Sequence, residues 1–336
     1  MTTIKQWADI KADYDDTLLL GNGASIAVNA NFAYRSLCQK LQELSSDGQL
    51  TALFEQFETQ DFELILHRLW IATQVNQQLG VAENATTKKY NLLRNLLIEC
   101  VNQNHPEHFE VSGVLANIRT FIGGFKTVLS LNYDLIVYWA SLLEDVKTGK
   151  VKDCFINHFF NDLYSWSDFR KLHPNDRYMG YQSTSLVFYP HGSLILAQDF
   201  NGQEGKIHTN QRSDMNYLQQ ISQHWVAGEA TPIFVSEGTS QQKLNAIARS
   251  RYLDTVYREV LPEKKESIVI YGWSMGKNDF HILDALKKSK PSRIAISVYG
   301  PDTSDCDAIE RRLKMVFGQG LIVEFFDSES ANCWCH

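Results

Sequence analysis

The sequence has no apolar run long enough to cross a membrane, no secretory leader and no cysteine spacing typical of a zinc site. A transmembrane helix requires roughly 20 apolar residues, and the opening residues MTTIKQWADIKADYDD lack the apolar stretch of a secretory signal. The six cysteines include no Cys-x-x-Cys pair. We therefore expect a cytoplasmic protein that does not associate with membranes and holds no structural zinc.

An excess of positive charge is also missing. The chain has 32 Lys and Arg residues against 39 Asp and Glu residues, which gives a formal net charge of −7. Nonspecific nucleic-acid binding depends on phosphate neutralisation by Lys and Arg, so this balance argues against direct nucleic-acid binding. There are no internal repeats, low-complexity tracts or long runs of like charge. The 336 residues, 44% of them hydrophobic, are typical of a globular protein with one large core or two smaller ones.

Seven short runs rich in apolar, β-branched or aromatic residues have the length of strands. Segments with helical spacing separate most of them, which is typical of a parallel sheet with crossover helices. The runs occupy residues 17–20, 127–131, 185–189, 232–236, 267–271, 294–299 and 321–326. We therefore predict an α/β fold built on a Rossmann-like parallel sheet of about six or seven strands.

Two long stretches interrupt this pattern. Between residues 46 and 120 no run is convincing as a strand, and the apolar spacing predicts several amphipathic helices. The segment 145–183 is rich in aromatic residues and longer than an ordinary loop, so we expect a small subdomain or a lid there. A hairpin or mobile excursion is expected near 198–212. We predict a discontinuous core formed by 1–45 and 121–336, with a helical insertion at 46–120.

Small and polar residues follow four of the predicted strands. The segments are LLLGNGAS ending at Ser25, VLSLNYD ending at Asp134, LVFYPHGS ending at Ser193 and IVIYGWS ending at Ser274. In an open parallel sheet the carboxyl ends of the strands line the ligand crevice. We therefore expect these four turns to form the walls of one nucleotide site.

The order and type of these segments resemble the sirtuin-like superfamily, whose members bind NAD. That family has a Gly-Ala-Gly-Ala-Ser phosphate loop, a Thr-Asn-Tyr-Asp segment, a catalytic His-Gly and a later Gly-x-Ser. The matching positions are Gly21-Asn22-Gly23-Ala24-Ser25, Ser130-Leu131-Asn132-Tyr133-Asp134, His191-Gly192 and Gly272-Trp273-Ser274. Because the zinc cysteines of the deacylases are missing, the sequence is more similar to the bacterial NAD hydrolases associated with antiphage defence.

The first of these turns has the composition of a phosphate loop. Glycines permit close backbone approach, and the amides of the helix that follows can hold a pyrophosphate. A third glycine at the usual dinucleotide-binding spacing is missing. The resemblance implies cofactor binding by the whole loop, and a plain strand-to-helix turn is the alternative. The loop consists of Gly21, Asn22, Gly23, Ala24 and Ser25.

Asn132 and His191 are the predicted catalytic residues. The resemblance implies that Asn132 positions the ribose and a water molecule, and that Asp134 supports the loop or the nicotinamide side. Alternatively, Asn132 caps a helix that starts near Asp134. The near-neutral pKa of histidine suits His191 to act as a general base, with a buried structural histidine as the alternative. His281 has no comparable setting and is expected to pack on a helix.

Further positions follow from the resemblance. Gly272 and Ser274 would approach the adenosine half of NAD, and Tyr299 would end the strand that flanks the adenine. Phe32 and Arg35 stand where the deacylases carry Gly-Ile-Pro-Asp-Phe-Arg, although the acid of that motif is absent.

Two segments near these positions have open interpretations. Glu237 contacts a partner or the cofactor in one interpretation, and a helix capped by Thr239 is the other. The terminal segment Cys333-Trp334-Cys335-His336 is expected to be an exposed tail, with adventitious metal chelation as the alternative.

The predicted function is hydrolysis of NAD to nicotinamide and ADP-ribose, as in antiphage effectors that deplete NAD. Alternatives are an NAD-dependent protein deacylase, which the missing zinc cysteines disfavour, and a noncatalytic nucleotide sensor, which needs neither Asn132 nor His191. The resemblance implies that the chain works as a homo-oligomer or beside a second defence protein, such as a helicase-like ATPase or an Argonaute-like protein.

Overall fold

The fold is α/β, with an eight-stranded parallel sheet at its centre. The computed structural model describes residues 3–33, 48–59, 62–82, 84–145, 147–160, 166–199, 201–207, 209, 217–227, 230–235, 239–300 and 303–336. The strand order is β1-β13-β12-β11-β2-β3-β7-β4, and every neighbouring pair is parallel. The strands are β1 (Ile4–Lys5), β2 (Thr17–Leu20), β3 (Thr127–Ser130), β4 (Lys150–Lys152), β7 (Thr184–Phe188), β11 (Ser267–Tyr271), β12 (Arg293–Val298) and β13 (Ile322–Asp327).

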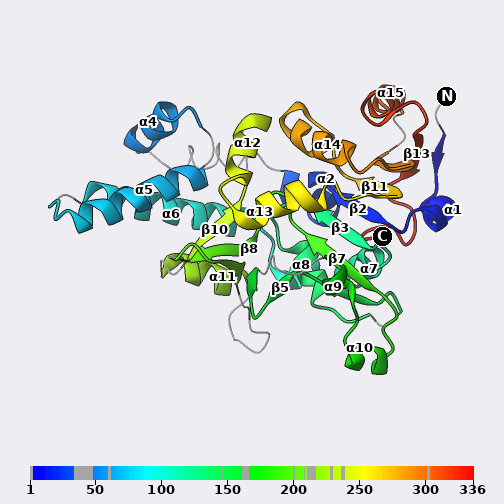
Figure 1. Ribbon diagram of the computed structural model, residues 1–336, viewed down its shortest axis with the longest axis horizontal. Coiled ribbons are helices and arrows are strands. Elements are labelled where there is room, and N and C mark those ends of the chain that lie inside the picture. The colour runs from blue at the N-terminus through cyan, green and yellow to red at the C-terminus, as the bar shows by residue number, and fades with distance from the viewer. Residues whose placement is uncertain are drawn as a thin grey trace.

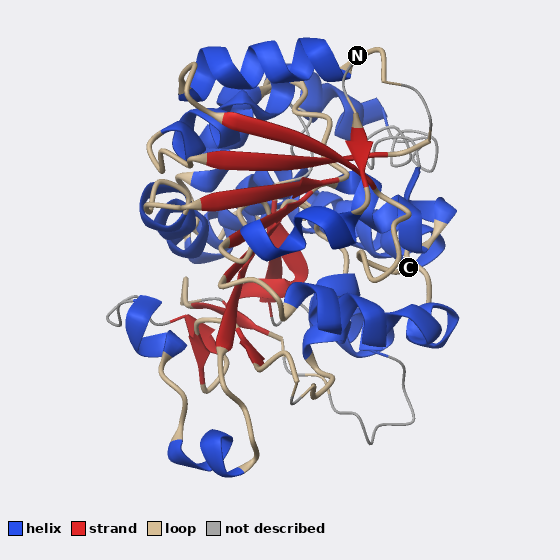
Figure 2. Cartoon of the chain, turned by 90° about the vertical axis from the view of Figure 1, so that its right-hand side faces the viewer, coloured by secondary structure: helices blue, strands red, loops and turns tan. Residues whose placement is uncertain are grey.

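Helices cover both faces of this sheet, which forms a twisted fan in Figure 2. Because both faces are covered, the central strands are continuous apolar runs, and all residues of β2, β7 and β11 are buried. In Figure 1, α14 (Phe280–Lys287) and α15 (Cys306–Phe317) lie on one side of the sheet and α7 (His108–Ile122) lies on the other. None of the helices in the described residues is long and apolar enough to cross a bilayer.

The described residues between 48 and 122, which lie between β2 and β3, are mainly helical, as the spacing in 46–120 predicts. In Figure 1, three of its helices extend away from the sheet, whereas α7 packs beneath the sheet. A capping box between Glu107 and Glu110 starts α7. The three projecting helices are α4 (Gly48–Gln56), α5 (Phe62–Gln78) and α6 (Ala85–Asn104).

A second, antiparallel sheet of five strands in the order β10-β8-β9-β6-β5 adjoins the first. Its strands are β5 (Phe155–Ile156), β6 (Phe159–Phe160), β8 (Gly192–Asp199), β9 (Glu204–Lys206) and β10 (Ala230–Phe234). The strand expected at 232–236 is therefore β10 of this sheet and does not join the parallel sheet. It pairs with β8, which follows β7 in the chain after a sharp turn at Gly192. The hairpin expected near residue 198 is formed by β8 and β9.

The remaining helices in the described residues are short. They are α1 (Trp7–Ile10), α2 (Asn22–Val28), α8 (Ile136–Ser141), α9 (Trp166–Arg170), α10 (Pro174–Tyr178), α11 (Tyr217–Val226), α12 (Ser240–Ile247), α13 (Arg251–Thr255), the 3-10 turns η1 (Lys11–Asp13), η2 (Ala30–Ala33) and η4 (Lys277–Asp279), and the π-helix η3 (Val256–Val260).

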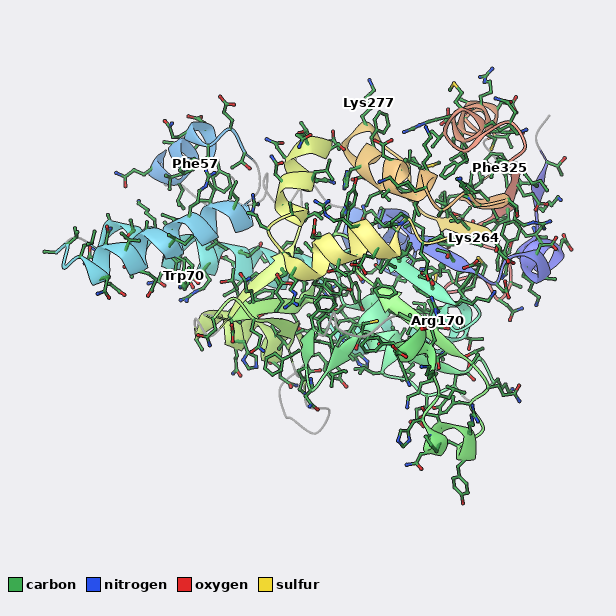
Figure 3. The ribbon with its side chains drawn as sticks, in the orientation of Figure 1. Phe57, Trp70, Arg170, Lys264, Lys277 and Phe325 are labelled. Atoms are coloured by element: carbon green, nitrogen blue, oxygen red, sulfur yellow. The ribbon has the colours of Figure 1, made fainter. Side chains whose placement is uncertain are left out.

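Within 145–183, β4 joins the edge of the parallel sheet, and α9 anchors the segment to β3. Arg170 of α9, which is labelled in Figure 3, donates to Thr127 Oγ1 at 2.6 Å.

The carboxyl-terminal segment is buried, so the expectation of an exposed tail is wrong. Cys333, Trp334 and Cys335 are 0%, 1% and 8% exposed. The indole of Trp334 packs against Phe121 and Tyr271, with ring centroids 6.3 Å and 5.8 Å away. A large aromatic surface favours burial in an apolar pocket over exposure to water, which explains the difference.

The sheet topology determines where a ligand crevice lies. From β2 the chain continues to β3 and β7 on one side, and it later returns to β11, β12 and β13 on the other. The order reverses between β2 and β11, and such a switch point opens a crevice outside the carboxyl ends of the strands. Leu20 pairs with Tyr271 on one side and Ser130 on the other. The strands therefore end level with one another, and the turns that follow them meet at one edge.

Candidate functional site

The glycine turn after β2 crosses the turn after β11 in close contact. The amide of Gly21 donates to the carbonyl of Tyr271 at 2.9 Å, and that of Gly23 donates to Gly272 at 2.7 Å. Gly272 has φ +66, and a Cβ there would lie 2.3 Å from the nitrogen of Ala24. The crossing therefore requires glycine at Gly272, and the amides of Gly21 and Gly23 are already engaged by protein carbonyls.

Asn132 joins the loop after β3 to the glycine turn. Its Nδ2 donates to the carbonyl of Gly21 at 2.9 Å and to Ser25 Oγ at 2.7 Å, and Ser25 Oγ donates in turn to Asp134 Oδ2. All three of these side chains are buried. Within the described part of the chain, nothing donates to Oδ1 of Asn132. This oxygen is therefore the atom of Asn132 left to bind a ligand.

The helix after this loop, α8, has Leu135 at its N-cap, with no side-chain cap hydrogen bond. Oδ1 of Asp134 accepts from the backbone N–H of Ile136, the first residue of α8, at 2.9 Å. The alternative interpretation of Asn132 as a helix cap is therefore wrong, and Asp134 connects α8 to the glycine turn through Ser25.

His191 lies in the turn after β7, beside the Asn132 loop. The backbone N–H of Leu194 donates to the carbonyl of Tyr133 at 2.8 Å, which ties the two turns together. Gly192 has φ +76, and a Cβ there would lie 2.2 Å from the carbonyl oxygen of Ile233. His191 is 4% exposed, and the nearby backbone of Leu131, the residue before Asn132, acts to raise the pKa of its ring.

A second histidine, which the sequence pattern does not single out, completes the group. His281 is buried on α14, as expected, but its Nε2 also lies 2.9 Å from Nε2 of His191. Asp279, immediately before α14, accepts from Lys243 Nζ at 2.7 Å and from Trp273 Nε1 at 3.3 Å. The only signal in the sequence is the placement of Asp279 and His281 shortly after the Gly-Trp-Ser turn.

Burial determines the charge of these two histidines. Loss of solvent lowers the pKa of His191 well below 6.5, and nearby Lys243 lowers it further. The same loss lowers the pKa of His281 to about 4. The pKa of Asp279 is also lowered: burial opposes this, but His191 and Lys243 outweigh it. At neutral pH both imidazoles are therefore neutral and Asp279 is a carboxylate.

His191, Asp279 and His281 together have the composition of a metal site. One ligand atom from each lies within 4.8 Å of the others, and two imidazoles with a carboxylate form a common ligand set for zinc and iron. Both oxygens of Asp279, however, already accept hydrogen bonds from Lys243 and Trp273. Each side chain of the group thus has a protein partner.

The other predicted site residues lie around this edge. Phe32 packs edge to face on His105 with ring centroids 5.3 Å apart. Ser274 is exposed after β11, and Tyr299 is 80% exposed after β12. Arg35 and Glu237 lie outside the described residues. Thr239 caps α12 by accepting from the backbone N–H of Gln242, as its alternative interpretation predicts.

A cavity of about 550 Å³ lies beside α8 and β4. Tyr138, Lys152, Phe155, Phe169 and Lys206 are among the residues that line it, and none of the predicted site residues does. It is therefore separate from the group formed by the four turns.

Comparison with known proteins identifies the family. The model of a family described as Domain of unknown function (DUF4917) matches residues 18–334. The chain belongs to the DUF4917 family. All four turns of this DUF4917 protein, and Trp334, lie within the matched region.

Other comparisons are more distant. No curated protein matches the sequence. A solved structure titled "Structural Basis for the Mechanism and Regulation of Sir2 Enzymes" is 12% identical, covers 95% of this chain and 90% of its own, and has a TM-score of 0.35. A TM-score this low describes a loose likeness and carries no functional argument.

Proposed function

We propose that the protein hydrolyses NAD by breaking the bond between nicotinamide and ribose. The observation that carries the proposal is the junction of Asn132 and His191 at the switch point. Asn132 binds Gly21, and the turn that carries His191 binds the Asn132 loop through the hydrogen bond from the Leu194 N–H to the carbonyl of Tyr133. An amide and an imidazole thus lie side by side at the edge where α/β proteins bind nucleotides.

The proposed reaction uses one water molecule. The bond between ribose C1′ and the nicotinamide nitrogen breaks, and its electron pair leaves with nicotinamide, which departs uncharged. The ribose passes through an oxocarbenium-like state, as in glycoside cleavage. The water oxygen bonds to C1′ and its proton passes to Nε2 of His191, which gives ADP-ribose. The lowered pKa of His191 keeps the ring neutral before this step.

The remaining groups suit the two ends of the substrate. Oδ1 of Asn132 would orient the ribose and the water. Because the amides of Gly21 and Gly23 are engaged, the pyrophosphate would be held by the exposed side chains of Asn22 and Ser274, which flank the crossing of the two turns. The exposed ring of Tyr299 would contact the adenine.

Product analysis tests the proposal. Mass spectrometry of NAD incubated with the protein should find nicotinamide and ADP-ribose, with no change when an acetylated peptide is added. General-base catalysis is worth about 10²–10⁴-fold, so His191→Ala should reduce turnover at least about 100-fold. His173→Ala, a substitution of an exposed histidine before α10, should retain the parent rate.

Each alternative function has its own result. Removal of the acetyl group from the added peptide would identify a deacylase. Binding of NAD without formation of products would identify a sensor. Nicotinamide release by His191→Ala at the parent rate would exclude the assigned base.

We also propose that this activity depletes NAD in antiphage defence and depends on assembly, as a homo-oligomer or with a second protein. In support, α5 and the residue after it carry an exposed apolar stripe on one helical face: Ile71, Val75 and Leu79 are 43%, 48% and 72% exposed. Turnover should be higher in assembled than in monomeric fractions of one preparation. Val75→Glu should shift the chain toward monomer and Gln77→Glu should not; equal turnover in all fractions would reject the dependence.

A further inference from the structure

Two histidines from distant parts of the chain meet nitrogen to nitrogen, and one of these nitrogens belongs to the proposed base, His191. Nε2 of His191 and Nε2 of His281 lie 2.9 Å apart. The ring centroids are 5.1 Å apart and the ring planes are inclined by 29°. The centroid distance exceeds the nitrogen distance by about two ring radii, so the nitrogens lie nearly on the line between the rings. This is the geometry of an N–H···N hydrogen bond.

The partners of the two rings determine which nitrogen donates. The hydroxyl oxygen of Ser240 accepts from the backbone N–H of His281, so the hydroxyl proton can donate to Nδ1 of the same ring, which leaves the ring proton of His281 on Nε2. A neutral imidazole has one donor and one acceptor nitrogen. Nε2 of His191 is therefore the acceptor, and Nε2–H of His281 is the donor.

Ser240 lies at the start of α12. Its hydroxyl donates to Nδ1 of His281 at 3.2 Å. The same hydroxyl oxygen accepts from the backbone N–H of His281 at 3.0 Å. Hydrogen bonds thus run in one direction, from Ser240 through His281 to Nε2 of His191.

Burial is the main cause that keeps both rings neutral, and the charged groups around this chain act in opposite directions. Lys243 of α12 and Asp279 of η4 face His191 and form an ion pair with each other. Tyr257 lies beside His281 with ring centroids 6.3 Å apart. Since Lys243 and Trp273 occupy both oxygens of Asp279, the carboxylate balances Lys243 and leaves the bond between the histidines intact.

We propose that His281 is a positioning residue for His191: its Nε2–H holds the neighbouring ring in the neutral tautomer with the proton on Nδ1 and the lone pair on Nε2. That lone pair accepts the proton of the reacting water. The water takes the place of the His281 N–H, and His191 becomes an imidazolium close to Asp279. The catalytic part of this inference rests on the proposed function; the tautomer does not.

Nuclear magnetic resonance of protein labelled with 15N-histidine tests the tautomer. The wild-type His191 should carry its proton on Nδ1. His281→Gln retains an N–H donor and should preserve that state, whereas His281→Phe retains an aromatic ring without a donor. In His281→Phe we expect mixed tautomers and a pKa of His191 higher by roughly half a unit to one unit. Ser240→Ala, which frees Nδ1 of His281, should also mix the tautomers without altering a buried ring.

Several outcomes would overturn the proposal. A proton on Nε2 of His191 in the wild type would do so, as would an unchanged tautomer and pKa in folded His281→Phe and Ser240→Ala. Stoichiometric binding of added Zn²⁺ that shifts both rings and is lost in His281→Gln would assign the group to a metal instead. Thermal unfolding of each variant verifies its fold.

Activity supplies a second readout. If NAD is hydrolysed, the acidic limb of the rate profile should move to higher pH in His281→Phe and stay in place in His281→Gln. If the acidic limbs of the wild type, His281→Phe and His281→Gln coincide, His281 does not position His191. If no NAD is hydrolysed, the proposed function fails, but the tautomer measurement still decides whether His281 positions His191.

Discussion

The indole nitrogen of Trp334 donates a hydrogen bond to the carbonyl oxygen of Ala24 at 2.8 Å. Ala24 lies in the glycine turn, so a residue of the carboxyl-terminal segment is hydrogen-bonded to the turn after β2 in the candidate site. Both residues are almost completely buried, and the bond spans nearly the whole sequence.

Trp334→Phe should destabilise the protein while preserving an aromatic ring in the pocket. The change leaves the carbonyl of Ala24 without its side-chain partner, and a lost buried partner costs about 1–3 kcal/mol. Urea unfolding measures this free energy. Tyr299→Phe, at an exposed ring, should change it by less than about 0.5 kcal/mol; equal effects of the two changes would contradict the role of Trp334.

Gly272→Ala should prevent the close crossing of the two turns. Gly272 and Gly300 both have a positive φ, +66 and +72, but only at Gly272 would a Cβ meet backbone, 2.3 Å from the nitrogen of Ala24. Gly300→Ala should therefore cost only the conformational penalty of about 1–2 kcal/mol. Gly272→Ala should cost roughly 1–3 kcal/mol more because of the overlap. Similar unfolding midpoints for Gly272→Ala and Gly300→Ala would show that the turns after β2 and β11 can move apart without loss of stability.

Asn132→Ala should lower stability as well as abolish NAD turnover. The buried amide binds both Gly21 and Ser25. Its removal takes the Asn132 donor from Ser25 Oγ and one of two donors from the Gly21 carbonyl, which also accepts from the Ala24 N–H, at a cost of about 1–3 kcal/mol. Asn22→Ala, at an exposed position of the same turn, provides the stability control and should change the unfolding free energy by less than about 0.5 kcal/mol. An Asn132→Ala protein with wild-type stability would contradict the network.

Acidification should destabilise the fold because its buried histidines resist protonation. The pKa of His281 is lowered to about 4 from 6.5, and that of His191 is lowered too. Between these values the unfolded chain binds protons that the folded chain excludes, so stability is complete above pH 6.5 and falls as the pH decreases toward 4. His281 alone contributes about 3 kcal/mol to this loss.

Urea unfolding at about pH 7.5, 6 and 5 measures that slope. His281→Gln removes the titrating ring and should make the slope shallower. If the slopes of the two proteins coincide, other groups account for the acid sensitivity.

The sequence by itself determined the central strands and their polar ends. Six predicted strands agree with β2, β3, β7, β11, β12 and β13 to within one residue at each end. Their apolar runs are local signals, because a strand covered on both faces needs apolar residues throughout. The four turns could be grouped from sequence since carboxyl ends of parallel strands share an edge.

Tertiary structure alone decided features that depend on partners distant in the sequence. β1 and β4 have two and three residues, too few for a periodic pattern, and they become strands because a neighbouring edge pairs with them. β10 has an ordinary strand composition, and only its pairing with β8 assigns it to the second sheet.

The same reason explains the group around His191. His281 reads as a core residue of an amphipathic helix, and it becomes a partner of His191 only when α14 packs behind the turn after β7, across a sequence separation of 90 residues. Cys333 and Cys335 are buried because Trp334 inserts between Phe121 and Tyr271. Local composition specifies where strands begin and end, whereas hydrogen-bond partners and burial depend on which surfaces the folded chain brings together.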